Sequence, residues 1–196
     1  MADEKAISAV CEAICHILRS AAKADNLKAD FQVYGPADFK DNTVKSGVTI
    51  FLYRVLPNLS HRTPAGRLLP NGHRQRTKLP LDLHLLLTVW SKDPDTEHLL
   101  VAWMMRTLED YPTIPASILN IKHEKTFATD ESIELVIGEM GGEEILHLWE
   151  VLGERVYHIT IPYVARMVTI ESRREELAGE PMQVRALDLR RLSEVP

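Results

Sequence analysis

The sequence predicts an α+β domain in which helices pack against a mixed, largely antiparallel sheet. Three observations support this fold class. The predicted elements run in the order helix, strands, helix, strand, helix, strands, so joins from strand to strand dominate. Apolar residues alternate along the predicted strand Leu81–Trp90 and recur every three or four positions in the predicted helices. The 196 residues, of which 45% are hydrophobic and 26% charged, fit one ordinary globular domain.

The first element is an amphipathic helix predicted over Ala6–Ala22. Its inward residues recur at spacings of three and four, and they are Ile7, Val10, Cys11, Ile14 and Leu18. Cys11 and Cys15 lie one helical turn apart, and no set of Cys and His residues with ligand spacing lies near them. We therefore expect both to be small buried hydrophobic residues. The helix is expected to stop near Asn26.

Two strands and a long loop follow. Phe31–Tyr34 is a short predicted strand that Gly35 and Pro36 end. Val48–Val55 is rich in β-branched and aromatic residues, which favours a second strand. Across residues 58–78 prolines, glycines and arginines are scattered, and we expect a long exposed loop or protruding hairpin. Loops of this length inside compact domains are usually functional or disordered.

The segment Leu79–Pro115 is the most distinctive part of the chain. It has the pattern of a strand, a polar break, an amphipathic helix and a proline stop, and it contains no arrangement of residues that could carry out a reaction. In Leu81–Trp90 one face is aliphatic and the other is mixed, as expected for a sheet partly covered by another element. Asp95 or Thr96 is predicted to cap the helix. The expected inward residues of this helix are Leu99, Leu100, Trp103, Met104 and Leu108.

The last elements are a strand, a helix and a long extended segment. Ser132–Ile137 is predicted as a strand, and Glu143–Leu152 as a short helix closed by Gly153. The expected inward residues of this helix are Ile145, Leu148, Trp149 and Leu152. Tyr157–Ile170 contains Pro162, which predicts an edge strand or a bulge between two shorter strands.

No motif indicates catalysis or a bound cofactor. The eight histidines form no HxH, HxxxH or HExxH pair, and the chain has no GxSxG, Walker or dinucleotide glycine loop. Gly141 and Gly142 precede a predicted helix, but Glu143 and Glu144 follow directly and would repel a phosphate. We expect no enzyme activity, no cofactor and no metal. The alternative that stays open is a small-molecule- or metal-binding or hydrolytic domain with a site assembled from dispersed residues such as Asp82, His84 and His158.

Nothing in the sequence indicates a membrane or secreted protein. No apolar run approaches the roughly 18 residues of a membrane span. The acidic start of the chain lacks the basic residues and apolar core of a secretory signal. We therefore expect no membrane contact and a cytoplasmic origin.

Charge is distributed unevenly along a chain whose net charge is −5. Residues 42–81 contain no Asp or Glu, and their basic residues are Lys45, Arg54, Arg62, Arg67, Arg74, Arg76 and Lys78. Three interpretations of this basic block stay open: binding to an acidic protein surface, a plain solvated loop, or nucleic-acid binding. The last is disfavoured because residues 58–78 contain no aromatic side chain on which a base could stack.

Six segments, taken in order, resemble a known family. They are AISAVCEAICHILR, VTIFLYRVLPNLSHR, LPLDLHLLLTVW, HLLVAWMMRTLEDYPTIP, IELVIGEMGGEEILHLWEVLG and YHITIPYVARMVTIES. Their combination resembles the tail-terminator, or cap, proteins of phage-tail-like contractile injection systems of the antifeeding-prophage and virulence-cassette type. The resemblance covers about Ala6–Ser172. It rests on patterned hydrophobic residues and on polar or aromatic positions that include Asn58, Arg62, Asp82, Tyr111, Pro112 and Trp149.

The resemblance implies a structural, non-enzymatic role. Terminator proteins form a ring, typically a hexamer, at the end of the tail distal to the baseplate, where they stop growth of the inner tube and the contractile sheath and join the two. The implied partners are copies of this chain, the inner tube protein and the contractile sheath protein. We expect a tail-terminator-like domain over residues 1–172 and a C-terminal arm over residues 173–196, in a particle assembled in the cytoplasm.

Two contact regions are predicted within this frame. The basic loop would face the tube or a neighbouring subunit through Arg62, Arg67, Arg74 and Arg76. In the arm, apolar residues interrupt a charge-rich tail, and those expected to bind the sheath or a neighbour are Val184, Leu187, Leu189 and Leu192. Trp103 and Trp149 are expected to be core residues and not interface hot spots.

Overall fold

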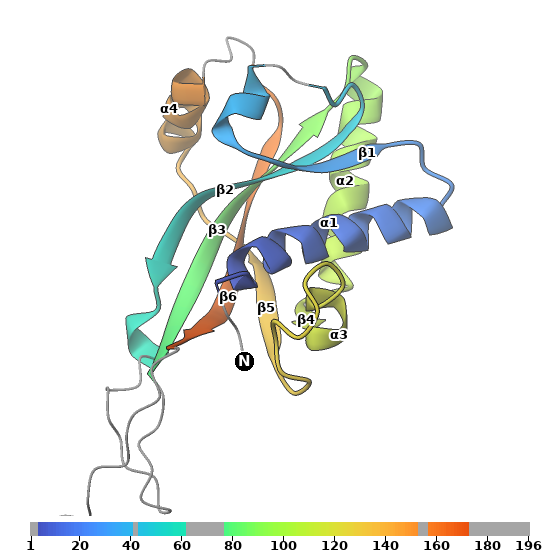
Figure 1. Cartoon of the computed structure of the whole chain (residues 1–196). Helices are drawn as coiled ribbons and strands as arrows, with labels where there is room; N and C mark the ends of the chain where they lie inside the picture. Colours follow the sequence, from blue (N-terminus) through green and yellow to red (C-terminus); the bar gives the residue numbers. More distant parts are fainter. Residues whose placement is uncertain (1–3, 41–42, 62–76, 153–156, 173–196) are drawn as a thin grey trace, which may run out of the picture.

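The computed structural model describes residues 4–40, 43–61, 77–152 and 157–172, and the elements below belong to this part of the chain (Figure 1). In chain order they are α1 (Ala6–Ala24), β1 (Asp30–Tyr34), the 3-10 helix η1 (Pro36–Phe39), β2 (Gly47–Pro57), the 3-10 helix η2 (Leu59–His61), β3 (Lys78–Trp90), α2 (Pro94–Glu109), β4 (Thr113–Pro115), α3 (Ala116–Leu119), β5 (Ser132–Ile137), α4 (Gly142–Leu152) and β6 (Thr160–Glu171). Each predicted helix and strand is present, whereas β4 and α3 are short elements that the sequence did not predict. None of the helices described is long and apolar enough to cross a membrane.

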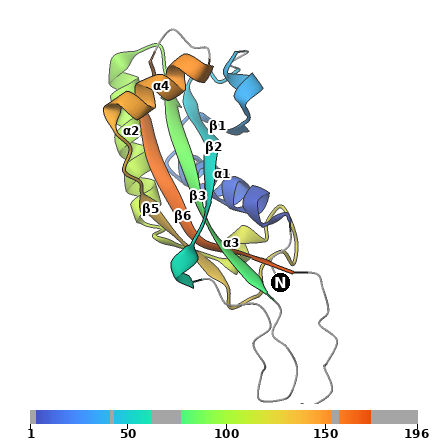
Figure 2. The ribbon, with the colours of Figure 1, turned by 90° about the vertical axis from the view of Figure 1, so that its left-hand side faces the viewer.

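The strands of this part of the chain form one six-stranded sheet, which confirms the predicted α+β fold. Their order is β1-β2-β3-β6-β5-β4, and the neighbouring strands are antiparallel except for the parallel pair β1 and β2. Figures 1 and 2 show α1, α2 and α3 on one side of the sheet and α4 on the other. The sheet is therefore a central layer between two helical layers of unequal size.

The larger core lies between the sheet and α1. The alternation predicted for β3 is confirmed, because Leu83 and Leu85 are buried on this side against residues of α1 such as Ile14. Cys11 and Cys15 are buried in the same core as free thiols, as predicted. Burial of aliphatic side chains stabilises the domain by about 25 cal/mol for each Å² of apolar surface removed from water.

A smaller aromatic core lies on the opposite side of the sheet, beneath α4. Phe39 of η1, Trp90 of β3 and Trp149 of α4 are buried, and their ring centroids lie 5.9 to 6.3 Å apart. The indole N–H of Trp90 donates a 2.8 Å hydrogen bond to the hydroxyl of Thr49, so this buried donor has a partner. Trp149 is a core residue, as predicted, and it packs α4 onto the sheet.

The prediction made for Pro162 was wrong about the edge position, and the β-bulge that β6 does contain lies between Ala165 and Val168 and not at the proline. β6 is one continuous strand in the interior of the sheet, and Pro162 lies opposite Leu86 of β3. The proline carbonyl accepts a 2.9 Å hydrogen bond from the N–H of Gly138, just beyond the last residue of β5. The N and C=O of one strand residue point to the same side, so the missing N–H of Pro162 faces the place where β5 has ended. The proline therefore lacks a donor toward Gly138, but this loss falls at the end of the β5–β6 ladder and not within it.

The start and the packed face of α2 also differ from the prediction. The cap is Asp93, whose carboxylate accepts a 2.9 Å hydrogen bond from the N–H of Thr96, and Pro94 occupies the first helical position. Leu99 is 72% exposed, because α2 meets the sheet through a narrow stripe that includes Leu100. The set of inward residues predicted for α2 was therefore larger than the set that the sheet buries.

Candidate assembly surfaces

β2, β3 and β6 run beyond the strands on either side of them and form a three-stranded end of the sheet (Figure 1). β1 pairs with β2 only as far as Phe51, and the pairing of β5 with β6 stops at Arg166. The strand residues beyond these points, 52–57 of β2 and 167–171 of β6, flank β3 without a further strand in the described part of the chain. The outer edges of this three-stranded end therefore carry backbone groups available for pairing.

Two β-bulges mark the base of the three-stranded end. The extra residue in β2 is Tyr53, and that in β6 lies between Ala165 and Val168, where Met167 has a φ of 64°. Both bulges face the same stretch of β3, residues 82–85. A bulge bends its strand and increases the local twist. Two bulges at one level turn the end of the sheet away from its body, as the curved strands in Figure 2 show.

The side chain of Asp82 joins the three strands at the level of these bulges. Its carboxylate accepts hydrogen bonds from the Asn58 amide at 3.0 and 3.3 Å and from the N–H of Met167 at 3.3 Å. The backbone N–H of Asn58 donates to the carbonyl of Pro80 at 2.9 Å. A left-handed φ at a residue other than glycine costs energy, and the acceptor on Asp82 offsets part of that cost at Met167.

The segments that flank both predicted contact regions meet at the tip of the three-stranded end. The N–H of Ser172 donates a 3.0 Å hydrogen bond to the carbonyl of Thr77. Lys78 and Glu171 form a 2.7 Å ion pair, and the hydrogen bond to Glu171 raises the pKa of Lys78. The beginning of β3, which follows the basic loop, and the end of β6, which precedes the arm, are thus held side by side.

The predicted contact residues themselves lie outside the described part of the chain. These are Arg62, Arg67, Arg74 and Arg76 in the loop and Val184, Leu187, Leu189 and Leu192 in the arm. Their roles stay predictions. The domain division at residue 172 is likewise a prediction, although β6 ends at Glu171.

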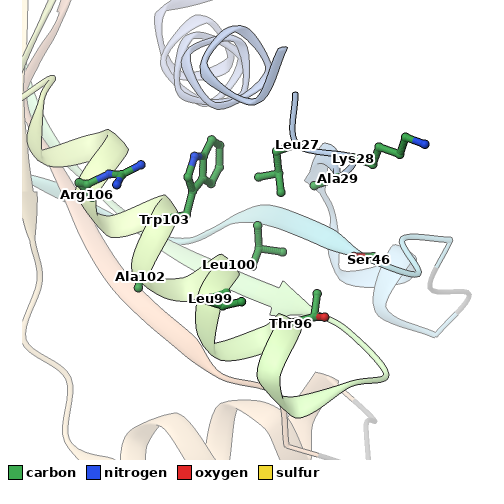
Figure 3. Close-up of a pocket in the computed structure, with 10 residues that line it drawn as sticks. All are labelled: Leu27, Lys28, Ala29, Ser46, Thr96, Leu99, Leu100, Ala102, Trp103 and Arg106. Atoms are coloured by element: carbon green, nitrogen blue, oxygen red, sulfur yellow. The ribbon is translucent and has the colours of Figure 1, made fainter. Parts of the chain in front are cut away.

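A groove of about 460 Å³ lies between α2 and the turn that connects α1 to β1 (Figure 3). Its walls are mostly apolar and include Leu27, Leu99 and Trp103, while Lys28 and Arg106 are the charged residues that line it. Figure 3 shows these two cations at opposite ends, with the apolar side chains between them. Sequence reasoning missed this groove because it assigned Leu99 to the core.

The Asp25 carboxylate contacts two of the side chains that form one wall of this groove. The indole N–H of Trp103 donates a 2.7 Å hydrogen bond to the Asp25 carboxylate, and an Arg106 nitrogen lies 3.9 Å from the same oxygen. Trp103 also packs against Phe31 of β1, with ring centroids 5.8 Å apart. The prediction for Trp103 as a core residue is only partly correct, because its ring is half-buried and forms the groove wall.

The outer face of α4 carries exposed apolar and acidic side chains together. Leu146 is 56% and Val151 is 72% exposed. Glu143 and Glu150 are exposed, and they stand three residues before and four residues after Leu146 on the same helix. Residues at these spacings lie along one face of a helix. α4 therefore presents an apolar side chain between two carboxylates.

Of the dispersed residues considered for a ligand or metal site, Asp82 and His84 share one face of β3, whereas His158 lies apart from them. Asp82 is bound to its strand partners as described above, and His84 packs edge-on against Tyr53 at 6.0 Å. Burial, aided by the positive charge of Arg54, lowers the pKa of His84. His158 packs with Trp90, 4.3 Å between ring centroids, and Trp90 is six strand residues, about 20 Å, from His84. Among the described residues there is no group of three or more His, Cys, Asp or Glu that could hold a metal ion.

Comparison with known proteins places the chain in a family. No curated protein matches it. Among solved structures, the sheath/tube terminator of the PVC extracellular contractile injection system, solved by cryo-EM in the extended state, matches with a TM-score of 0.64 and 16% identity over 90% of this chain. The tube terminating cap of the anti-feeding prophage matches with a TM-score of 0.51 and 14% identity over 70% of this chain. This chain spans 60% of the first of these proteins and 47% of the second.

These structural matches show a shared fold and agree with the resemblance seen in the sequence. The family model of the Pvc16 N-terminal domain matches residues 9–183, which is most of the chain. The chain therefore belongs to the Pvc16 N-terminal domain family.

Proposed function

We propose that this chain is a structural, non-enzymatic cap protein of a contractile injection particle. It forms a ring, a hexamer of identical subunits, at the end of the particle distal to the baseplate, where it stops growth of the tube and the sheath and joins them. The observation that carries the proposal is the fold, because a sheath/tube terminator shares it over 90% of this chain. Family membership across residues 9–183 supports it independently.

The architecture fits the physical requirements of a terminator. A cap must bind the last ring of a polymer on one face and offer no equivalent face for further addition. The two sides of this sheet differ, since α1, α2 and α3 cover one and α4 covers part of the other (Figures 1 and 2). Such different faces form heterologous contacts, which close into rings. The three-stranded end adds open strand edges to which a partner strand can pair.

The central experiment is electron microscopy of particles from a strain that lacks this chain. Without a terminator, tube and sheath growth has no defined end, so we expect particles of uncontrolled length, or tubes without sheaths. Re-expression of the chain should restore one length. Particles of normal length and normal sheath attachment in the deletion strain would contradict the proposal.

The basic loop is proposed to bind the tube or a neighbouring subunit. Replacement of all four arginines, Arg62, Arg67, Arg74 and Arg76, by Glu should abolish co-sedimentation of the chain with assembled tubes, because like charges then meet the acidic partner. Replacement of the same four by Lys keeps the charge and is the matched control. Undiminished binding of the Glu variant would remove the loop from the interface.

The C-terminal arm is proposed to bind the sheath or a neighbouring subunit. Deletion of residues 173–196 should leave a folded domain, with an unchanged melting transition, that no longer caps particles. A chain of full length with Ser in place of Val184, Leu187, Leu189 and Leu192 tests the apolar contacts alone. Loss of folding on deletion would show instead that the arm belongs to the core.

A further inference from the structure

We infer that the groove between α2 and the α1–β1 turn of one subunit receives the outer face of α4 from the neighbouring copy of this chain. The inference rests on the ring proposed above and names the surfaces that would close it.

The groove is suited to a helix that carries an apolar side chain between two negative charges. Its middle is formed by Leu27, Leu99 and Trp103, and Leu99 gains most from being covered because 72% of it is exposed. Its charged lining residues, Lys28 and Arg106, are both cations and lie at its two ends (Figure 3). Arg106 is 72% exposed despite its contact with Asp25, so it remains available to a further carboxylate.

The outer face of α4 has the complementary pattern. Leu146 lies between Glu143 and Glu150, which are seven residues, about 10 Å, apart along the helix. Residues 142–152 contain no Lys or Arg, so the charge of this face is negative apart from any contribution of His147. His147 lies 3.5 Å from Glu150, and both side chains are exposed. An apolar contact with a carboxylate on each side would thus meet an apolar groove with a cation at each end.

The positions of the two surfaces make the contact intermolecular. Both views of the ribbon place α4 on the opposite side of the sheet from α1 and α2 (Figures 1 and 2). The α4 face of a subunit cannot reach its own groove through the sheet. A head-to-tail contact between identical subunits satisfies both surfaces at every position of a ring and leaves none unpaired when the ring closes.

Charge reversal with rescue tests the pairing in the full chain. The α4 variant carries Glu143→Lys and Glu150→Lys, and the groove variant carries Lys28→Glu and Arg106→Glu. Each alone places like charges in contact and should raise the dissociation constant of the ring at least about tenfold, measured by native mass spectrometry and sedimentation velocity. An equimolar mixture of the two variants should restore rings in which the variants alternate, because each α4 then meets a groove of opposite charge.

The matched control for the α4 variant carries Glu124→Lys and Asp130→Lys, which make the same charge change on exposed residues of the loop after α3. It should form rings like the unsubstituted chain. Leu146→Ser and Leu99→Ser test the apolar contact without changing charge, and because both side chains are exposed each variant should keep its melting transition while losing ring affinity.

The outcomes separate this inference from the proposed function. Normal rings from the α4 and groove variants would overturn the inference alone. Loss of rings in each variant without restoration in the mixture would also overturn it, and would assign the groove to another occupant such as the tube, the sheath or the arm. A chain that forms no ring even with tubes present would overturn the proposed function first and this inference with it.

Discussion

Gly47 offers the sharpest test of the packing between β1 and β2. An ideal Cβ built on Gly47 would lie 2.7 Å from the backbone N and carbonyl C of Asp30, and closer still to its carbonyl oxygen. Optimal separations between non-bonded carbon atoms are about 3.5–4.0 Å, so β1 must move by about 1 Å to admit the methyl group of Gly47→Ala. The atoms in the way belong to the backbone, and no side-chain rotation can relieve the contact.

The expected cost follows from two effects. Overpacking of this kind costs about 1–3 kcal/mol. The shift also weakens the start of the parallel pair, where the N–H of Asp30 donates a 2.9 Å hydrogen bond to Ser46, and one such bond contributes about 1 kcal/mol. Gly47→Ala should therefore lower the free energy of unfolding by about 2–4 kcal/mol. For a chain of this size that corresponds to a fall in melting temperature of about 4–16 °C.

Urea denaturation and differential scanning calorimetry measure the effect. The matched control is Gly142→Ala at the first residue of α4, where an added Cβ meets no atom within 4 Å. This control should change stability by less than about 1 kcal/mol and in the stabilising direction. If Gly47→Ala lowered the free energy of unfolding by less than about 1 kcal/mol, the close approach of the two strands would be refuted. Because Ser46 lines the groove, the same substitution should also weaken ring formation if the further inference holds.

Three further predictions rest on single sites. Asp82→Ala leaves the Asn58 amide without its acceptor and should lower the free energy of unfolding, measured by urea denaturation, by about 1–3 kcal/mol. Asp82→Asn keeps an acceptor and should lower it less. Equal losses in the two variants would contradict a role for the hydrogen bond from Asn58. Burial raises the pKa of Cys11 to about 12 and that of Cys15 to about 11, so neither should react with a thiol reagent near pH 8 until the domain unfolds; fast labelling of the native chain would show otherwise. Asp93→Ala should lower the melting temperature at neutral pH and have less effect below about pH 4. The reason is that hydrogen bonds from Thr96 at the start of α2 lower the pKa of Asp93. Their stabilisation is therefore present above the pKa that Asp93 has in the unfolded chain, and it is lost as the pH falls through the pKa of the folded chain. A difference in melting temperature that does not depend on pH would argue against this cap.

Periodicity predicted the elements well where one pattern dominated the local sequence. The alternation in β3 and the apolar stripe of α1 correctly assigned the buried residues apart from Ile7, which is partly buried, because each side chain's direction follows from the repeat of the backbone. The errors came where the outcome depended on distant segments. Pro162 was expected at an edge or a bulge, yet β6 is interior because β5 pairs with it, and the proline is tolerated because β5 ends beside it. Leu99 was expected in the core, yet the helix–sheet contact is narrower than the apolar pattern.

The candidate sites divide in the same way. The uneven distribution of charge along the chain indicated the basic loop, because the charge of a segment follows from its amino-acid composition alone. The groove combines residues of the turn after α1, Ser46 before β2, and residues of α2, which are more than 70 positions apart at their extremes. No local pattern could have joined them. The Asp82 contacts are similar, because a β-bulge in β6 brings the N–H of Met167 within reach of a residue 85 positions away.

The amino-acid sequence by itself determined the order and type of the main elements, the α+β class, the family resemblance and the absence of any local catalytic motif. These properties follow from the periodicity of neighbouring residues. The tertiary structure alone decided the order of the strands, the placement of α4 opposite α1 and α2, and the three-stranded end that brings the flanks of both predicted contact regions together. Those properties depend on which distant segments pair and where each strand stops, and that choice is made by packing of the whole chain.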